Sequence, residues 1–275
     1  MTTVAQALAA ARALGVTRLD ARLLLAGLLG QRPSWLAAHG EAALDLAAAR
    51  DFGAGCRRLT SGEPLAYVLG HWSFRGLRLA VSPAVLVPRP ETELLVEWAL
   101  ERLAADRPAP GLPRVIDLGT GSGAIAISLA LECPQARVWA SDRSEAALAV
   151  ARANAEALGA KVTFLQGDWW QATPGLAFEL AVANPPYVAD GDPHLQALAY
   201  EPAGALRAGA DGLADLRRIV AGARTHLAPG GWLLLEHGHD QGAAVRRLLQ
   251  EQGWGDLQTR PDLAGLDRCS AGRRG

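Results

Sequence analysis

Cysteines, long apolar runs and an excess of basic charge are scarce or absent in this chain of 275 residues. The three cysteines, Cys56, Cys133 and Cys269, lie far apart and form no CxxC pair, which argues against a disulfide framework and a zinc site. The longest apolar run, residues 23–29, is much shorter than the roughly 20 residues that span a bilayer. No secretion signal is visible at the N-terminus. We therefore expect a cytoplasmic protein without a membrane segment.

The charge balance is close to neutral, with a formal net charge of -1. This leaves no basic excess for the backbone of a nucleic acid, so we expect no direct nucleic-acid partner. Half of the residues are hydrophobic and a fifth are charged, as in ordinary globular proteins, which excludes disorder and collagen-like repeats. The length fits about two domains at roughly 150 residues per domain.

Residues 1–66 show helical periodicity only. Apolar residues recur at helical spacing, for example at Leu8, Ala11 and Leu14, while glycine and proline interrupt the pattern. We predict an N-terminal bundle of four or five short helices over this range. Because the bundle carries no motif for chemistry, it serves either to dock a partner or to stabilise the chain.

Residues 67–90 follow a different pattern, with apolar side chains alternating around Gly76 and Pro83 up to Val87. This alternation predicts a β-hairpin linker, which the prolines at 88 and 90 end. The acidic residues Glu91 and Glu93 then open a helix, because carboxylates are favoured near the positive end of a helix dipole.

Residues 91–275 alternate between strand and helix signals after Pro113. The predicted strands are 114–118, 137–141, 162–166, 179–183, 231–236 and 255–259, and helices at about 123–132, 144–158, 211–227 and 240–252 separate them. This order predicts an α/β domain with a parallel sheet covered by helices on both faces. Such folds bind ligands at the carboxyl ends of their strands, where the chemistry is therefore expected.

A glycine-rich turn, Gly119-Thr120-Gly121-Ser122-Gly123, follows the first predicted strand. Glycines let such a turn tighten, and the next helix points its free N–H groups at a ligand. The second strand ends at Asp142, whose carboxylate can accept both hydroxyls of a ribose. The alternative for Asp142 is capping of the helix that starts near residue 144. The turn and Asp142 together fit several nucleotide cofactors.

The third and fourth strands end in further polar and aromatic residues. Asp168 and Trp169 suit an adenine, through a hydrogen bond to its amino group and through stacking, unless the tryptophans at 169 and 170 simply close the core. Asn184, Pro185, Pro186 and Tyr187 end the fourth strand. Two prolines hold the backbone away from the sheet, so the Asn184 oxygen and the Pro185 carbonyl can accept both hydrogens of a planar NH2 group, on which Tyr187 can stack.

These residues resemble the class I S-adenosylmethionine-dependent amino-methyltransferases, whose (D/N)PP(Y/F/W) members modify adenine N6, cytosine N4 or glutamine amides. Further segments narrow the resemblance to the peptide chain release factor N5-glutamine methyltransferase family. These segments are GHWSFRG at 70–76, LVPRPETE at 86–93, DLGTGSG at 117–123, NPPY at 184–187, Glu201-Pro202 with Ala205-Leu206, and Glu236-His237-Gly238. The resemblance covers essentially the whole chain. It implies a Rossmann-like catalytic domain that follows an N-terminal helical domain and a hairpin linker.

The resemblance also implies a reaction and its residues: N5-methylation of the glutamine in the GGQ loop of class 1 peptide chain release factors. Gly119, Thr120, Gly121, Ser122 and Gly123 would line the methionine part of the S-adenosylmethionine cofactor. Asp142 would hold its ribose, and Asp168 and Trp169 would flank its adenine. The glutamine amide would be held by Asn184, Pro185, Pro186 and Tyr187. Asn184 would also border the cofactor. We expect Asn184, Pro185 and Tyr187 to carry catalysis without a general base, and the enzyme to act as a monomer.

Other interpretations stay open at this point. The acceptor could be a glutamine of a ribosomal protein or, with less support, adenine N6 in DNA, although DNA enzymes need a basic groove to extrude a base. A nicotinamide-dependent oxidoreductase would explain the glycine turn but not residues 184–187. A binding module that has lost catalysis would not need these intact motifs. His237 and His239 could share one face of a strand end, but no third ligand at suitable spacing makes them a metal site.

Overall fold

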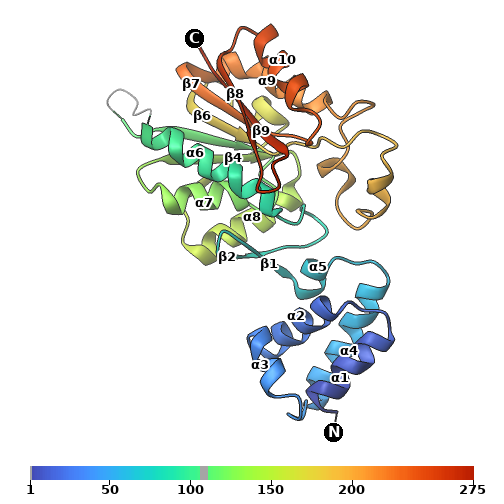
Figure 1. Cartoon of the computed structure of the whole chain (residues 1–275). Helices are drawn as coiled ribbons and strands as arrows, with labels where there is room; N and C mark the ends of the chain where they lie inside the picture. Colours follow the sequence, from blue (N-terminus) through green and yellow to red (C-terminus); the bar gives the residue numbers. More distant parts are fainter. Residues whose placement is uncertain (1, 106–110) are drawn as a thin grey trace. The chain divides into compact units, whose positions relative to one another are not determined.

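The computed structural model describes residues 2–105 and 111–275. The chain divides into two compact units, Met1–Trp72 and Ser73–Gly275, which carry the N-terminal and C-terminal labels of Figure 1. None of the helices in these described residues combines the length and the apolarity needed to span a bilayer.

The N-terminal unit is a helical bundle, as predicted. Its helices are α1 (Val4–Ala13), α2 (Arg18–Leu29), α3 (Pro33–Ala38), α4 (Leu46–Thr60) and α5 (Leu65–Leu69). Thr3, Thr17 and Asp45 each accept a backbone N–H at a helix start, which satisfies donors that the helix itself leaves free. Tyr67 lies in α5, so the bundle reaches beyond residue 66, where the linker was expected to begin.

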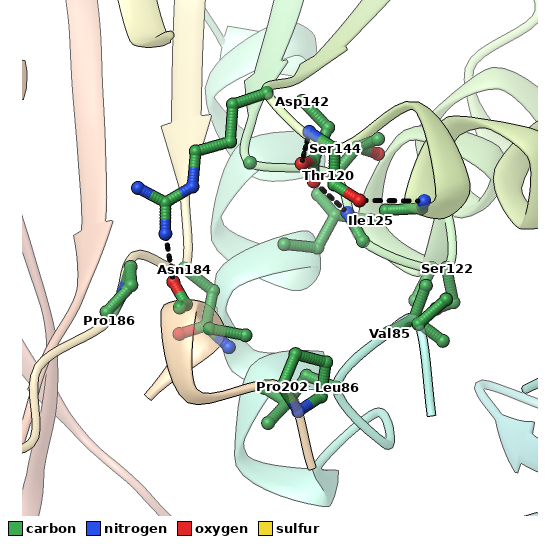
Figure 2. A pocket seen from close by; sticks show the side chains of 18 of the residues that line it. Val85, Leu86, Thr120, Ser122, Ile125, Asp142, Ser144, Asn184, Pro186 and Pro202 are labelled. Atoms are coloured by element: carbon green, nitrogen blue, oxygen red, sulfur yellow. Dashed lines mark hydrogen bonds between the residues drawn. The ribbon is translucent and has the colours of Figure 1, made fainter. Parts of the chain in front are cut away.

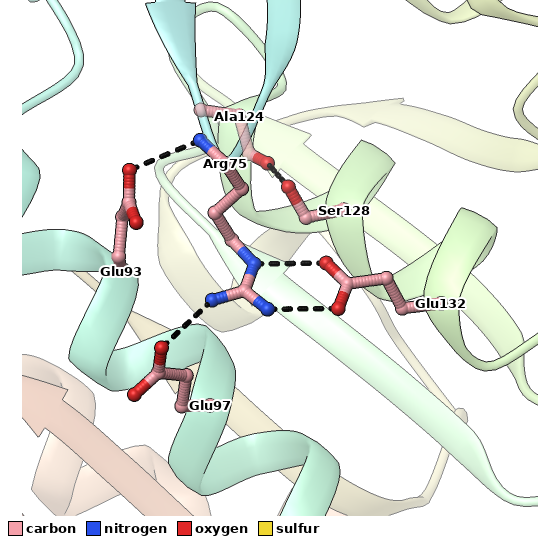
Figure 3. A network of polar contacts seen from close by, with 6 residues as sticks. All are labelled: Arg75, Glu93, Glu97, Ala124, Ser128 and Glu132. Atoms are coloured by element: carbon pink, nitrogen blue, oxygen red, sulfur yellow. Dashed lines mark hydrogen bonds and ion pairs between the residues drawn. The ribbon is translucent and has the colours of Figure 1, made fainter.

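A two-stranded hairpin follows, formed by β1 (His71–Phe74) and β2 (Leu77–Ala80). The tip residue Arg75 has a φ of 48°, and its backbone N–H donates to Glu93 Oε1 at 3.0 Å. Its guanidinium forms two hydrogen bonds with Glu132, at 2.8 and 2.7 Å, and one with Glu97 at 3.2 Å (Figure 3). Arg75 thereby fastens the hairpin tip to two helices of the C-terminal unit.

The second arm of the predicted linker is not a strand. Residues 81–89 contain no β-ladder, because two prolines at 88 and 90 lack the N–H group that a ladder needs. The N–H of Val87 donates to Glu201 Oε2 at 3.0 Å instead. The predicted hairpin is thus confirmed as β1 and β2, and the apolar residues that follow it are buried along an irregular segment.

The C-terminal unit contains a seven-stranded mixed sheet in the order β5-β4-β3-β6-β7-β9-β8. Its strands are β3 (Arg114–Leu118), β4 (Arg137–Asp142), β5 (Val162–Gln166), β6 (Phe178–Ala183), β7 (Leu227–Glu236), β8 (Gly255–Pro261) and β9 (Asp267–Arg273). Six of these strands were predicted and five of them run parallel, which confirms the α/β class. β9 was missed and pairs antiparallel with both β7 and β8, so the sheet is not purely parallel.

Helices cover both faces of this sheet (Figure 1). They are α6 (Glu93–Ala105), α7 (Ala124–Glu132), α8 (Glu145–Leu158), α9 (Ala214–His226) and α10 (Gly242–Glu251). α6, α7 and α8 share one apolar core with Val115, while α9 and α10 share another with Ile116. Successive β3 residues thus face opposite layers. The chain visits β4 on one side of β3 and later β6 on the other, so a crevice is expected at the carboxyl ends of β3 and β6.

Candidate functional site

A cavity of about 280 Å³ lies at these strand ends in the C-terminal unit, close to the lower limit of roughly 300–1,000 Å³ for small-molecule sites. Its lining comes from residues within 84–92, 119–125, 142–147, 167–169, 184–186 and 202–205. Figure 2 shows Thr120, Asp142 and Ser144 gathered on one side of the pocket, and Asn184 and Pro186 on another. Most residues that the sequence singled out therefore meet in one place.

The glycine-rich turn leaves β3 and bends sharply into the cavity. The N–H groups of Gly119 and Thr120 both donate to the carbonyl of Ser141, at 2.8 and 2.9 Å, which fixes the turn against β4. Gly119 has a φ of 74°, and residues 119–122 all line the cavity.

Gly123 has another position and purpose. It does not belong to the cavity lining and precedes α7 with a φ of 85°. A Cβ atom here would lie 2.8 Å from Ile127 Cδ1 and 3.3 Å from the Cβ of Ala151 on α8. The third glycine of the turn therefore permits close packing of α7 and α8, while its neighbours face the pocket.

Asp142 ties the end of β4 to the glycine turn. Its Oδ2 accepts from Gly121 N at 3.0 Å and its Oδ1 from Ser144 N at 2.9 Å. The side chain that caps α8 is that of Ser144, which accepts from Ala147 N at 3.2 Å. An ionised carboxylate offers about four acceptor positions, so Asp142 keeps capacity for two ribose hydroxyls.

Trp169 and Trp170 point to different environments. Trp169 lines the cavity and its Nε1 donates to Asp215 Oδ1 at 3.1 Å. Trp170 is buried in the core, where its Nε1 donates to the Ile219 carbonyl at 2.8 Å. Trp170 is therefore a core residue, whereas Trp169 packs against the same core and also lines the cavity.

Asp168 lies beside Trp169 in the cavity lining. Arg218 on α9 pairs with Asp168 and also with Asp215, the latter at 3.2 Å. The Arg218 guanidinium thus contacts both Asp215, which accepts from the Trp169 indole, and Asp168. Through these contacts α9 fixes the segment that follows β5.

The segment after β6 is only partly exposed to the cavity. Asn184 and Pro186 line it, whereas Pro185 is buried and neither Pro185 nor Tyr187 belongs to the lining. Burial, and secondly the negative charge of Glu236, raise the pKa of the Tyr187 phenol. The Nδ2 of Asn184 donates to Thr92 Oγ1 at 3.1 Å.

Two carboxyl groups, those of Asp117 and Glu236, are buried at strand ends outside the cavity lining. Asp117 at the end of β3 accepts from the Thr120 hydroxyl at 2.6 Å and from Ala126 N at 3.2 Å. Burial raises its pKa to about 7. Glu236 ends β7 and is fully buried, and burial likewise raises its pKa to about 7.

The sequence assigned no role to Arg89, Arg143 and Gly204, which line the cavity, or to Glu201, which lies next to lining residue Pro202. Glu201, whose side chain is 2% exposed, accepts from Arg89 at 2.5 Å and from Val87 N. Arg143 donates to the Gly204 carbonyl at 2.9 Å. These bonds hold residues 201–205 against the rest of the wall. Val87, Arg89 and Glu201 had a sequence signal, since they lie in the quoted segments 86–93 and 201–202, whereas Arg143 and Gly204 had none.

His237 is engaged away from the cavity lining. Its Nε2 is 2.8 Å from Ser270 Oγ, its Nδ1 is 2.8 Å from the Gly238 carbonyl, and burial lowers its pKa. His239 is exposed. Within residues 2–105 and 111–275, no group of three or more His, Cys, Asp or Glu side chains is arranged to hold a metal ion.

Two families match separate parts of the chain. Residues 1–70 match the PrmC N-terminal domain, and residues 92–209 match the Methyltransferase small domain. The second range contains the glycine turn and every other residue predicted for the site.

Relatives match nearly the full length. The release factor glutamine methyltransferase of Burkholderia pseudomallei is 51% identical over 271 residues, covering 95% of this chain and 94% of the relative. The protein of the same name from Bordetella pertussis is 50% identical, with coverage of 94% and 95%.

Solved structures support the fold. A methyltransferase from Pyrococcus furiosus superposes with a TM-score of 0.54 at 18% identity, over 80% of this chain and 97% of that chain. The 16S rRNA N2 methyltransferase of Thermus thermophilus, in complex with AdoMet and guanosine, gives a TM-score of 0.54 at 23% identity, with coverage of 74% and 50%.

Proposed function

The chain belongs to the release factor glutamine methyltransferase family, and we propose that its cavity places S-adenosylmethionine beside the amide of an acceptor glutamine. The enzyme methylates the side-chain nitrogen, N5, of the glutamine in the GGQ motif of release factors. The observation that supports these roles best is that Asn184 borders the same cavity as residues 119–122 and Asp142.

Different residues of the cavity would contact different parts of the cofactor. Gly119, Thr120, Gly121 and Ser122 would contact its methionine part, with Gly123 supporting the turn from outside the lining. Asp142 would accept the ribose hydroxyls, which suits a carboxylate with spare acceptor positions. Asp168 would accept from the adenine amino group, and Trp169 would stack on the base.

The acceptor amide requires orientation more than deprotonation. S-adenosylmethionine supplies a methyl group on a positively charged sulfonium, which makes it a strong electrophile. The amide lone pair is delocalised into its carbonyl, and its proton is far too weakly acidic for a side chain to remove first. The Asn184 side-chain oxygen and the Pro185 carbonyl would accept its two hydrogens, align its nitrogen and stabilise the developing positive charge. Pro186 and Tyr187 would flank the amide plane.

We further propose that the N-terminal unit docks the body of a class 1 release factor, and that the enzyme acts as a monomer in the cytoplasm. The functional domains would be 1–66 for docking, 67–90 as linker and 91–275 for catalysis. The match of residues 1–70 to the PrmC N-terminal domain supports the docking role. Removing this unit should impair methylation of an intact release factor far more than methylation of a short GGQ peptide. Equal losses would make the unit a stabilising element.

Intact-mass spectrometry tests the proposed reaction directly. A purified class 1 release factor is incubated with this protein and S-adenosylmethionine, and its peptides are then mapped. We expect a gain of one methyl group on the GGQ glutamine and no gain in a release factor whose GGQ glutamine is replaced by alanine. Methylation of a ribosomal protein or DNA in its place would overturn the substrate, and failure to bind the cofactor would overturn the whole proposal.

A further inference from the structure

The side-chain amide of Asn184 must face one particular way to serve the acceptor glutamine. An asparagine amide has an oxygen that accepts and an NH2 group that donates, and the two have nearly the same shape. Only the orientation with Oδ1 toward the glutamine offers an acceptor to its NH2 group. In the structure Nδ2 is occupied, because it donates to Thr92 Oγ1 at 3.1 Å.

Thr92 can enforce this orientation if its own hydrogen is engaged elsewhere. A hydroxyl carries a single hydrogen and accepts through its lone pairs. Thr92 ends the short 3-10 helix Pro90–Thr92 and is 4% exposed, so water does not readily compete for that hydrogen. Once it is given to another acceptor, Thr92 Oγ1 can only accept from Asn184, which must then present its NH2 group.

Glu236 supplies such an acceptor. Both of its oxygens are buried, and neither has a hydrogen-bond partner of standard geometry among the described residues. β6 and β7 pair with Ala183 opposite Leu235, so Asn184 and Glu236 follow one another across the ends of these two strands. The hydroxyls of Thr92 and Tyr187 and the charge of Arg268 lower the pKa of this carboxyl, against the larger effect of burial. A buried carboxyl group that lacks a hydrogen-bond partner is costly, so the position of Glu236 next to Asn184 requires an explanation.

We propose that Glu236 and Thr92 are positioning residues that hold the Asn184 amide with its oxygen toward the acceptor glutamine. Glu236 takes the Thr92 hydrogen, Thr92 takes an Asn184 hydrogen, and Asn184 Oδ1 remains for the substrate. Three segments distant in sequence, the 3-10 helix before α6, the end of β6 and the end of β7, meet for this purpose. The inference rests on the proposed function, because it concerns the same amide pocket.

Thr92→Val and Thr92→Ser provide the first test. Valine keeps the shape but cannot accept from Asn184, whereas serine keeps the hydroxyl. With a GGQ release factor as substrate, we expect Thr92→Val to lower kcat about tenfold, the effect of losing one hydrogen bond in the transition state, while Thr92→Ser stays near wild type. The dissociation constant for S-adenosylmethionine, measured by calorimetry, should change little in either variant. Equal kcat for valine and wild type would overturn the inference.

A double-mutant cycle tests whether Glu236 acts through Thr92. Glu236→Gln keeps the volume, but its amide can donate to Thr92 as well as accept, which loosens the orientation. We expect it to lower kcat in the wild-type background and to have no further effect in Thr92→Val. Equal losses in both backgrounds would overturn the coupling. Wild-type protein that fails to methylate the release factor would instead refute the proposed function, so the two failures are distinguishable.

Discussion

Gly119 leaves the space that the ring of Trp169 occupies, since a Cβ atom at this glycine would lie 2.9 Å from Cζ3 of the indole. The turn after β3 and the turn after β5 are therefore matched to one another. If the indole stacks on the adenine, this close approach sets the depth of the adenine pocket.

Gly119→Ala should weaken S-adenosylmethionine binding by at least about tenfold, because the methyl group displaces the indole of Trp169. The substitution also places alanine at a φ of 74°, which costs about 1–2 kcal/mol of stability by itself. Gly159→Ala is the matched control, because Gly159 has a φ of 69° and a Cβ there would meet nothing within 4 Å. Calorimetric titration should show a binding defect in Gly119→Ala alone. A similar defect in both variants would argue against the contact with Trp169.

Asn184→Ala should abolish most methyl transfer while leaving cofactor affinity largely intact. Removing one preorganised hydrogen-bond partner from a transition state typically costs about 10²–10³ in rate. Single-turnover methylation of a GGQ release factor, with cofactor binding measured separately, checks this expectation. A single-turnover rate near that of wild type would show that Asn184 does not hold the reacting amide.

Asp215→Ala should loosen Trp169, because Asp215 accepts the indole N–H at 3.1 Å and also pairs with Arg218. We expect the dissociation constant for S-adenosylmethionine to rise about threefold to tenfold, as for the loss of one hydrogen bond. Asp211→Ala is a suitable control, since Asp211 pairs with Arg217 and lies outside the cavity lining. Unchanged affinity in Asp215→Ala would mean that packing alone positions the indole.

Each strand of the seven-stranded sheet that the sequence predicted contains β-branched or aromatic residues, and the strand that it missed, β9, contains none. Asp267–Arg273 contains no β-branched or aromatic residue, so propensity gives no signal for β9. Its strand conformation comes from pairing with β7 and β8. Conversely, the apolar residues at 85–87 contributed to the predicted hairpin linker but lie outside its strands, and the N–H of Val87 donates to Glu201, more than a hundred residues away. Such distant partners override local pattern.

The same distinction applies to the site. Asp142 and Asn184 could be predicted because each ends a parallel strand, and such ends meet at one edge of a sheet. The relationship of Thr92, Asn184 and Glu236 could not, since no local pattern encodes which side chain accepts from which. Gly119 and Gly123 belong to the same glycine-rich turn, and the sequence does not distinguish their roles. Gly119 lines the cavity, whereas Gly123 allows α7 and α8 to pack closely. Only tertiary neighbours separate those roles.

Asp117 should make the stability of the enzyme depend on pH. Burial raises its pKa from 3.8 to about 7 in the folded chain, so the folded state holds a proton that the unfolded chain has already lost in this interval. As pH rises from about 4 to 7, the free energy of unfolding should therefore fall by up to about 4 kcal/mol through this group.

Asp117→Asn removes that titration while its Oδ1 can still accept from Thr120 and Ala126. In the wild-type protein the other carboxyl oxygen of Asp117 is buried and has no hydrogen-bond partner. The variant places its NH2 group there, which lowers the stability by an amount that does not depend on pH. Relative to wild type, the variant should gain stability steadily from pH 5 to pH 7.5 in urea unfolding experiments, and the difference should level off above the folded pKa. A difference that stays constant with pH would show that Asp117 is ionised in the folded protein throughout this range, and that the Thr120 hydroxyl and the Ala126 N–H outweigh the effect of burial.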